Sequence, residues 1–579
     1  MERLETKRIH GRTYYYYSKW EWRHGKCRRV WQKYLGKLED IVRAVDQGGP
    51  CPRYAEVFQW GLTEALWREC CRAQVCDLIN RHVRKRDQGL TTGEYLAIAA
   101  LNRAMQARSK RSMWHWFAAT TLLRHLPKAT AATLSSQRFW DHMDRVAAPK
   151  AQDIWREILQ GVVAREQIDL SRVCYDGTNF YTFIDTFNTR CAIARRGKNK
   201  QGRDNLRQVS YALFCCADGQ LPLYYEVYEG NRNDAKQFPL MLERFRQFFR
   251  QLSGARGPAA PQPDITVIFD KGNNSKENFH LLDDMQLSYV GSVKLDEHKD
   301  LAVAPHNDAR FQASDAHPPG CKSFRIKKKV YGRQRVLVVT YNQNLFDSQW
   351  ATLQADIGKA LERLGQLQTR LEDRRAGLIA GGRAPTQASL HKQCQAILKR
   401  QHLKRLIAIT LTADDNGLPR LHYQLDSAAQ QDLEKTYLGK NILISDREGW
   451  DDARLIEAYR SQFLIEGVFK EMKDRSTGNW WPMFHWTDSK IQVHALYCTI
   501  AVLLRALLWR RVRQAGVQIS LKRLLGELQD IREIVNIYPA RGKQPSERRQ
   551  TVLSKRNELQ QRLLVLLGLT EAAKNAILG

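Results

Sequence analysis

The chain has 579 residues, with 92 Lys and Arg against 61 Asp and Glu, which gives a formal net charge of +31 and a pI near 9.8. This surplus favours a polyanionic partner, most simply nucleic acid, and the length predicts about three or four domains. We recognise no apolar run of transmembrane length, no lipidation motif and no signal peptide, so a membrane partner is not expected.

The 12 cysteines are scattered along the chain, with no CxxC pair and no Cys/His spacing typical of a zinc module. Several lie in apolar, strand-like runs, such as Cys174 and the pair Cys215–Cys216. Reduced, buried thiols are typical of the cytosol, so we expect a cytoplasmic protein.

Residues 1–50 are predicted to form a basic, aromatic β-hairpin module. The stretch RTYYYYSKWEWRHGKCRRVWQKYLGK alternates with strand period and has a turn signal at His24-Gly25-Lys26. Arginine and lysine interleaved with Tyr and Trp suit phosphate contact and base stacking. The alternative is a small sheet with a solvated basic face.

Residues 51–168 have apolar side chains at helical spacing, interrupted by the basic loops RHVRKRDQG and RAMQARSKRSMW. We interpret this segment as a helical N-terminal DNA-binding domain. Plain helical packing with basic edges is the alternative, because no helix-turn-helix register is distinct enough to identify.

From residue 169 the pattern becomes strand-like. SRVCYDGTNFYTFID predicts one strand, and QVSYALFCCADGQLPLYYEVYEGN predicts a hairpin of two more, turning at Asp218-Gly219. A helix near Asp234, the strand ITVIFD, a helix from about Lys276 and the strand LSYVGSV follow. This order predicts the first part of an α/β, ribonuclease-H-like catalytic core over 169–293.

A long interruption, 294–445, separates this part of the core from the next. It is rich in predicted strands, for example FRIKKKVYGRQRVLVVTYN and NILIS. Leucine and isoleucine at three-to-four spacing from Asp347 onward predict a helical hairpin over about 346–404. We therefore expect a strand-rich insertion that carries a helical hairpin.

The core resumes over 446–514, where one continuous helix is predicted over Asp451–Asp474. At roughly 100° per residue, its polar side chains divide between two faces. The inward set is Tyr459, Gln462, Glu466 and Lys473, and the solvent set is Glu457, Arg460 and Glu471. Polar groups on an inward face need partners, a metal or a phosphate.

An apolar helix from about Asp488 follows, which we expect to be too short and too closely flanked by arginine to span a bilayer. Residues 515–579 are predicted to form a helical C-terminal region. It ends in the apolar helix LQQRLLVLLGL, where we expect core or dimerisation contacts.

Three acidic residues stand out: Asp176 in the strand VCYDGT, Asp270 at the end of TVIFD, and Glu466 on the predicted helix. Carboxylates from separate strands and from a helix packed over the sheet can converge at one point. Three carboxylates together repel unless divalent cations neutralise them. Two Mg²⁺ ions about 3.5–4 Å apart are the familiar solution for phosphodiester chemistry. We therefore predict that Asp176, Asp270 and Glu466 are catalytic and bind two Mg²⁺ ions, for which Mn²⁺ can substitute.

These motifs resemble those of the DDE transposases of bacterial insertion sequences, in the branch with a Tyr-x2-Arg-x3-Glu-x6-Lys signature and a strand-rich insertion before the catalytic Glu. Here the signature residues are Tyr459, Gln462, Glu466 and Lys473, with the usual spacing but Gln in place of Arg. The stretches that resemble other family motifs are Asp176-Gly177-Thr178, Phe269-Asp270-Lys271-Gly272, and Gly197–Gln208 with Asn199 and Gln201 replacing the usual Ser and Asp.

The resemblance implies a cut-and-paste DNA transposase that nicks DNA at its terminal inverted repeats and transfers the strands to target DNA within a synaptic homodimer. It also implies DNA contacts by Tyr459, Gln462, Lys473 and Lys271, and Arg460 or Arg454 are the candidates to supply the charge that Gln462 lacks. A cytoplasmic, nucleoid-associated protein of a bacterium is the corresponding expectation.

Two other functions stay open. Gln462 favours a domesticated or catalytically impaired transposase that binds DNA without cutting it. A ribonuclease-H-like nuclease without strand transfer is the second, although the basic N-terminal module and the large insertion exceed what simple cleavage needs.

Overall fold

The structure is a computed structural model that describes residues 1–23, 25–46, 51–83, 89–198, 202–253, 264–379, 381–382, 385–413, 417–474, 478–539 and 547–570. His24, Asn199 and Gln201, which belong to the sequence motifs above, lie outside the described residues. The chain divides into two compact units, so the segment expected as one helical domain is shared between them. The first holds Met1–Cys70, Lys110–Ser136 and Leu508–Gly579, and the second holds Cys71–Ser109 and Gln137–Leu507.

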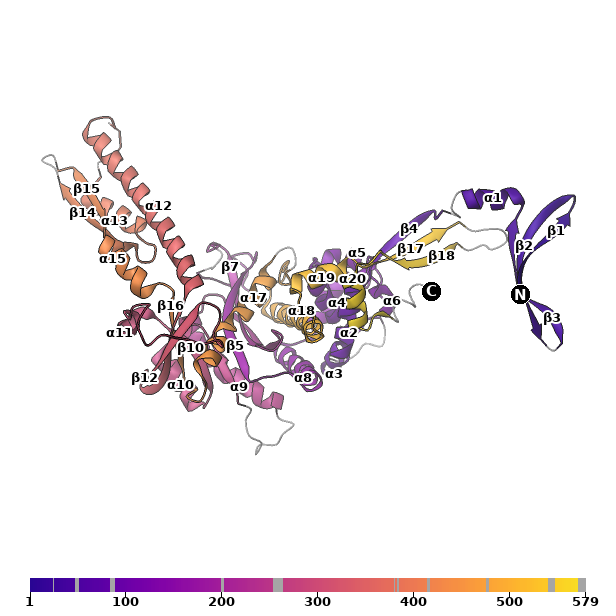
Figure 1. The fold of residues 1–579 in the computed structure, drawn as a ribbon, viewed down its shortest axis with the longest axis horizontal. Coiled ribbons are helices and arrows are strands. Elements are labelled where there is room, and N and C mark those ends of the chain that lie inside the picture. Colours follow the sequence, from indigo (N-terminus) through magenta and orange to yellow (C-terminus); the bar gives the residue numbers. More distant parts are fainter. Residues whose placement is uncertain are drawn as a thin grey trace. The chain divides into compact units, whose positions relative to one another are not determined.

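The N-terminal part of the first unit is a three-stranded antiparallel sheet (Figure 1). Its strands are β1 (Glu2–Ile9), β2 (Arg12–Arg23) and β3 (Lys26–Gly36), and helix α1 (Leu38–Asp46) follows them. Strands β2 and β3 are the expected hairpin. The additional strand β1 is fixed by Glu5, which accepts hydrogen bonds from Ser18 on β2 and Gln32 on β3.

A second three-stranded sheet of this unit joins segments from both ends of the sequence. Its strands are β4 (Tyr54–Gln59), β17 (Arg532–Tyr538) and β18 (Arg548–Leu553). The predictions of a helical 51–168 and a helical C-terminal region are therefore wrong at these strands, because partners so distant in sequence leave no local periodic signal. The helices here are α2 (Gly61–Arg72), η1 (Lys110–Ser112), α5 (Met113–Ala118), α6 (Leu122–His125), α19 (Leu521–Gln529) and α20 (Glu558–Leu566).

The helices outside the central sheet of the second unit include α3 (Val75–His82), α4 (Thr92–Met105), α7 (Ser136–Met143) and α8 (Ala148–Glu166). Helix α18 (Asp488–Gln514) begins in the same unit. Among the described residues it is the one helix long and apolar enough to cross a membrane, so the expectation that it is too short is wrong. Its apolar window is 94% buried inside the protein, as in the core helix of a globular domain.

The expected ribonuclease-H-like order of strands is present in the second unit. Strand β5 lies between the antiparallel pair β7 and β8 on one side and the parallel strands β9 and β10 on the other. The elements are β5 (Arg172–Tyr181), β6 (Arg195–Arg196), β7 (Arg207–Cys216), β8 (Pro222–Glu229), α9 (Asp234–Ser253), β9 (Thr266–Ile268), α10 (Lys276–Asp284) and β10 (Ser288–Val293).

The strands of the segment 294–445 belong to two sheets, because β14 and β15 pair only with each other and the others join the core sheet. Its strands β16, β13, β12 and β11 extend the core sheet beyond β10 into a ten-stranded sheet. The bounds are η3 (Leu295–Glu297), α11 (Lys299–Ala302), β11 (Gln312–Ala313), β12 (Cys321–Val330), β13 (Arg333–Asn342) and β16 (Lys440–Ser445).

Between β13 and β16 a separate projection extends away from the sheet (Figure 1). It contains the expected helices and has its own core, in which Leu364, Leu390 and Leu406 are fully buried. Its elements are α12 (Gln343–Arg375), α13 (Gln387–Ile397), α14 (Leu403–Leu406), β14 (Ile407–Ala413), β15 (Pro419–Leu425), α15 (Ser427–Asp432) and η4 (Leu433–Tyr437).

Candidate active site

One of the two predicted catalytic aspartates lies on β5, and the other lies in extended backbone just past the end of the neighbouring parallel strand β9. The register pairs Cys174 of β5 with Ile268 of β9. Two residues further along each chain, Asp176 and Asp270 are therefore level with one another. Because side chains alternate along a strand and adjacent strands lie about 4.8 Å apart, both carboxylates leave the same face of the sheet at neighbouring positions.

Asp270 does not end the strand, as the sequence predicts, but follows it. Strand β9 ends at Ile268, and Asp270 is the residue before the short helix η2 (Lys271–Asn273). Asp176 lies within β5 and is partly buried, and the backbone N–H of Gly177 donates to its carboxylate at 2.7 Å.

The predicted single helix is two helices, α16 (Asp452–Arg460) and α17 (Gln462–Lys473), which meet at Ser461. The Ser461 hydroxyl donates to the backbone carbonyl of Ala458 at 2.5 Å. A hydroxyl that bonds back into the preceding turn competes with the helical hydrogen-bond ladder and bends it. The helical wheel drawn through 451–474 therefore fails at this residue.

Helix α17 lies along the face of β5 that carries Asp176. At one end, the thiol of Cys174 lies 3.4 Å from the hydroxyl of Ser461. At the other end, the ammonium of Lys473 donates to the hydroxyl of Thr178. Cys174, Asp176 and Thr178 share one face of the strand, so Asp176 lies between the two contacts.

Glu466 is two helical turns before Lys473, on the same side of α17. Its side chain is exposed, although the sequence places it on an inward face. The helix thus brings Glu466 to the face of the sheet that bears the two aspartates, in contact with solvent.

Tyr459 is the signature residue with the most contacts. Its hydroxyl lies 2.7 Å from that of Ser292 on β10 and close to the side chains of Asp270 and Asn441. Burial raises the pKa of the Tyr459 phenol, the hydrogen bond to Ser292 opposes this shift, and the Asp270 carboxylate adds to it. Tyr459, which the sequence predicts to contact a DNA phosphate, is therefore hydrogen-bonded to protein groups beside an aspartate. Ser292 and Asn441 belong to no motif, so the sequence offers no signal for them.

Of the five predicted DNA-contact residues, Lys271 and Arg460 are exposed, whereas Tyr459, Gln462 and Lys473 are partly or fully buried. Lys271 is exposed and lines a cavity of about 420 Å³ with Lys294 and Asn441. Arg460 is exposed at a second cavity, of about 860 Å³. Gln462, which replaces the usual Arg, is only 8% exposed, so it lies within the protein rather than on its surface.

Glu471 is not a solvent-face residue, contrary to the prediction. It pairs with the guanidinium of Arg505 on α18, which is 1% exposed. Trp450, His485 and His494 also have structural contacts in this region. Trp450 is 8% exposed and contacts Arg447 and Arg454, which leaves its ring little surface for a displaced base.

His485 and His494 are 3% and 0% exposed. The imidazole of His494 lies 2.8 Å from the backbone carbonyl of Trp480 and 2.5 Å from the hydroxyl of Tyr497. Neither histidine is placed to contact DNA.

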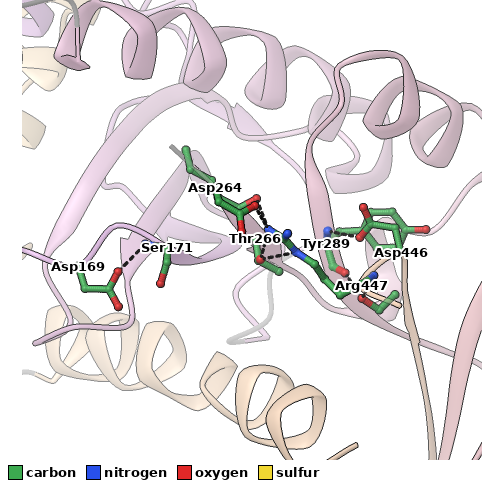
Figure 2. A network of polar contacts seen from close by, with 9 residues as sticks. Asp169, Ser171, Asp264, Thr266, Tyr289, Asp446 and Arg447 are labelled. Carbon is green, nitrogen blue, oxygen red and sulfur yellow. Dashed lines mark hydrogen bonds and ion pairs between the residues drawn. The ribbon is translucent and has the colours of Figure 1, made fainter. Parts of the chain in front are cut away.

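A polar network fixes the start of β9 to the end of β16 (Figure 2). The guanidinium of Arg447 donates to the hydroxyl of Thr266 at 2.9 Å and to the carboxylate of Asp264. The carboxylate of Asp446 accepts from the backbone N–H of Tyr289 at 2.9 Å, at the start of β10. The start of β9, the strand that leads to Asp270, is thus held by residues that follow the projection in the sequence.

Carboxylates are the ligands preferred by Mg²⁺ and Mn²⁺, so the donor chemistry of Asp176, Asp270 and Glu466 fits a divalent cation. Within the ranges that the structure describes, no three His, Cys, Asp or Glu side chains surround one point closely enough to hold a metal. The neighbouring positions of the two aspartates provide two of the three carboxylates of such a site. The predicted convergence of all three requires the exposed Glu466 side chain to approach them.

A family model described as "Transposase DDE domain" matches residues 169–504, more than half of the chain. No curated protein matches the sequence. Two similar solved structures are a piggyBac transposase synaptic complex with hairpin DNA and a Mos1 transposase paired-end complex with left transposon end. The first is 8% identical over 81% of this chain and 78% of that chain, with a TM-score of 0.32. The second is 12% identical over 36% and 60%, with a TM-score of 0.15. TM-scores this low support no conclusion about this chain.

Proposed function

From the premise that this chain belongs to the transposases with a DDE domain, we propose that it binds the ends of an insertion sequence, cleaves them by two-metal-ion phosphodiester hydrolysis and joins the 3′-hydroxyl ends to target DNA. The observation that carries the proposal is the placement of Asp176 within β5 and of Asp270 just past the end of the adjacent parallel strand β9, each two residues beyond the paired Cys174 and Ile268. Helix α17, with Glu466, lies along the same face.

In this proposal Asp176, Asp270 and Glu466 hold two Mg²⁺ ions, or Mn²⁺ in their place. When bound, such ions activate a water or a 3′-hydroxyl and stabilise the leaving oxygen. Tyr459 holds the Asp270 carboxylate in place from within the protein. Lys473 is fixed against Thr178 beside Asp176. Exposed Lys271 and Arg460 are the cations free to reach DNA phosphates near the cut.

The proposed partner is double-stranded DNA, both the terminal inverted repeats and the target, within a synaptic homodimer in the bacterial cytoplasm. Support comes from the net charge of +31 and from the sheet β1–β3. On this sheet Arg3 lies over the ring of Trp20 and Lys7 lies over that of Tyr16. Cations beside aromatic rings suit a surface that binds phosphates and bases.

A catalytically impaired DNA-binding protein is the second candidate function, which Gln462 favours, because its amide cannot replace a guanidinium. Incubation of the full chain with labelled DNA from the ends of its own element and Mg²⁺ tests both. Joined products support a transposase, cleavage without joining supports a ribonuclease-H-like nuclease, and retention without cleavage supports the binding protein.

We predict that Asp270→Ala abolishes cleavage and joining while leaving DNA retention largely intact, because the substitution removes one metal ligand and no positive charge. Gel-based cleavage and filter retention of the same labelled DNA measure the two effects separately. Asp284→Ala is the matched control, since this carboxylate is 72% exposed on α10, and it should leave both unchanged. Loss of retention equal to the loss of cleavage would count against a catalytic role for Asp270.

A further inference from the structure

The loop that follows β5 is held rigidly by one arginine. The Arg207 guanidinium donates to four backbone carbonyls of the loop Thr182–Ala194, at distances of 2.7 to 2.9 Å. These carbonyls belong to Asp185, Asn188, Cys191 and Ala194. Asp488 of α18 accepts the backbone N–H of Ile193 at 3.1 Å. We name Thr182–Ala194 the Arg207 loop.

This braced loop presents two phenylalanines to solvent. Phe187 is 90% exposed and Phe183 is 61% exposed, although a large apolar side chain is usually buried when the backbone around it is fixed. The ring of Phe183 contacts that of Tyr181 edge-on, with centroids 5.6 Å apart, and Tyr181 stacks on Trp481 at 4.6 Å. The Phe183 ring thus continues an aromatic stack that is anchored in the core, and Phe187 lies four residues further along the same loop.

Arginines are frequent in the segments next to the two rings. The guanidinium of Arg196, on β6, donates to the hydroxyl of Thr186 at 2.9 Å, next to Phe187. Arg203 lies over the ring of Tyr181 at 4.9 Å. Exposed Arg190 and Arg195 add positive charge within the same segment. An apolar protein surface would have to desolvate these guanidinium groups, whereas a nucleic-acid strand offers them phosphates and offers the rings a base to stack on.

The location suits a DNA strand that passes the candidate active site. Tyr181 follows Asp176 by five residues of continuous strand, a span of about 16 Å at the usual rise. A stacked strand covers that span in about five nucleotides. Bases paired within a duplex expose only their edges in the grooves, so an aromatic face there requires a base that has left its pair.

We propose that Phe183 and Phe187 form a stacking site for unpaired bases, with Arg190, Arg195 and Arg196 binding the adjoining phosphates. The inference rests on the proposed function, because it takes DNA as the ligand. It adds that the protein holds DNA opened a few nucleotides from the cut.

The test uses the full chain in EDTA, so that cleavage does not interfere. The probes are a single-stranded oligonucleotide, the matched perfect duplex, and the same duplex with a short central run of mismatches. We expect the Phe183→Ser/Phe187→Ser double variant to bind the single-stranded and mismatched probes at least tenfold more weakly, since each stacked base contributes a factor of roughly five or more. Affinity for the perfect duplex should stay within about twofold, because its bases are not available to stack.

Two further variants make the result specific. Phe187→Trp should retain single-strand affinity, because it keeps an aromatic face. Leu378→Ser, which removes another exposed apolar side chain (76% exposed), should change none of the affinities. Quenching of a 2-aminopurine base in the single-stranded probe should accompany binding by the wild type and by Phe187→Trp, and should be lost in the double variant.

Equal losses on all three probes, or no loss on any, would overturn the stacking site while leaving the proposed function in place. A wild type that binds the perfect duplex but not the single strand would do the same. A change in oligomeric state of the double variant without any change in DNA affinity would assign the two rings to a protein contact and overturn the inference. Failure of the wild type to bind any of the three probes would instead contradict the proposed function itself.

Discussion

At the scale of single residues, Tyr459 departs most clearly from its expected role. The signature suggests a side chain that points at a DNA phosphate, whereas the phenol is bonded to Ser292 and lies beside Asp270. Its position follows from strand β10, which places Ser292 next to the end of β9. In the proposed function Asp270 binds metal, so Tyr459 acts through that carboxylate as a positioning residue.

We predict that Tyr459→Phe and Ser292→Ala each raise the concentration of Mg²⁺ needed for half-maximal cleavage about tenfold or more, because an unsupported carboxylate binds metal more weakly. Titration of cleavage with Mg²⁺, and of Mn²⁺ binding to the DNA-free protein, measures the change. Retention of DNA should be unaltered, as should both titrations for the control Tyr423→Phe on β15. Weakened retention with an unchanged metal requirement would instead favour a phosphate contact by Tyr459.

Glu471 shows why a helical wheel is a limited guide to burial. It lies on the side of the predicted helix opposite the signature, yet a second buried layer, helix α18, covers that side. The Arg505 guanidinium there also donates to the backbone carbonyl of Ala104 at 2.7 Å. A wheel identifies sides of a helix, but only tertiary packing decides how many of them are covered.

Glu471→Ala should destabilise the second unit by about 3 kcal/mol, because it leaves the buried Arg505 charge without its carboxylate. Thermal unfolding followed by circular dichroism measures the shift, and Glu457→Ala, on an exposed position of α16, is the control. A midpoint equal to that of the control would indicate that the remaining contacts of Arg505 suffice.

At the scale of elements, local patterns predicted the strands and helices of the core, while their long-range relations could not be predicted. The meander of β5, β7 and β8 has alternating or apolar runs and a clear Asp-Gly turn, so its order is evident from residues 169–229 alone. Strand β4 has no such signal, because its partner β17 lies at the other end of the chain. The pairing of β16 with β10 and with β13 could not be predicted for the same reason, because the residue pattern of a strand does not indicate which strand it pairs with.

The candidate site also has a part that the sequence predicts and a part that it does not. Asp176, Asp270 and Glu466 could be found because acidic residues in a particular order along the chain form a recognisable motif. The break at Ser461 and the support from Ser292 and Asn441 depend on packing between elements, which the motif does not encode.

The projection between β13 and β16 enters and leaves the sheet at one point. Tyr341 pairs with Lys440, and the backbone N–H of Asn342 donates to the carbonyl of Gly439 at 2.9 Å. Gly439 already has a φ of +75°. Joining Asn342 directly to Gly439 would therefore create an Asn-Gly hairpin turn, the dipeptide preferred for two-residue loops.

Deletion of Gln343–Leu438 is accordingly expected to leave a folded second unit, because the flanking strands remain paired by a favoured turn. Circular dichroism and thermal unfolding should report a cooperative transition within several degrees of the full chain, with less helical signal. Fusion at a shifted point, Tyr341 to Lys440, is the matched control and should fold poorly, because it removes the turn residues. Failure of the first deletion to fold would indicate that the sheet depends on the core of the projection.

At the scale of the whole molecule, charge is the dominant property. A net charge of +31 implies that DNA binding releases many counterions, whatever the sequence of the DNA. Recognition of particular ends must then come from a smaller set of base contacts superimposed on that general attraction.

We predict that affinity for duplex DNA, measured in EDTA by fluorescence anisotropy, falls by about a thousandfold or more between 50 and 200 mM salt, as for proteins with about six or more phosphate contacts. The logarithm of the affinity should fall linearly with the logarithm of the salt concentration. A decrease of less than tenfold would mean that most of the surplus charge is not in contact with DNA.

The level register of Asp176 and Asp270 also bears on how such a chain can change during evolution. One residue inserted within β5 before Asp176 would turn that side chain to the opposite face, because the pleat alternates at every position. At the junction of Asn342 and Gly439, by contrast, we expect a gain or loss of any length to be tolerated if it returns the chain to the same pair of strands. On the proposed function we therefore expect related chains to differ by whole appendages at this junction, and an insertion of one codon in β5 to abolish activity.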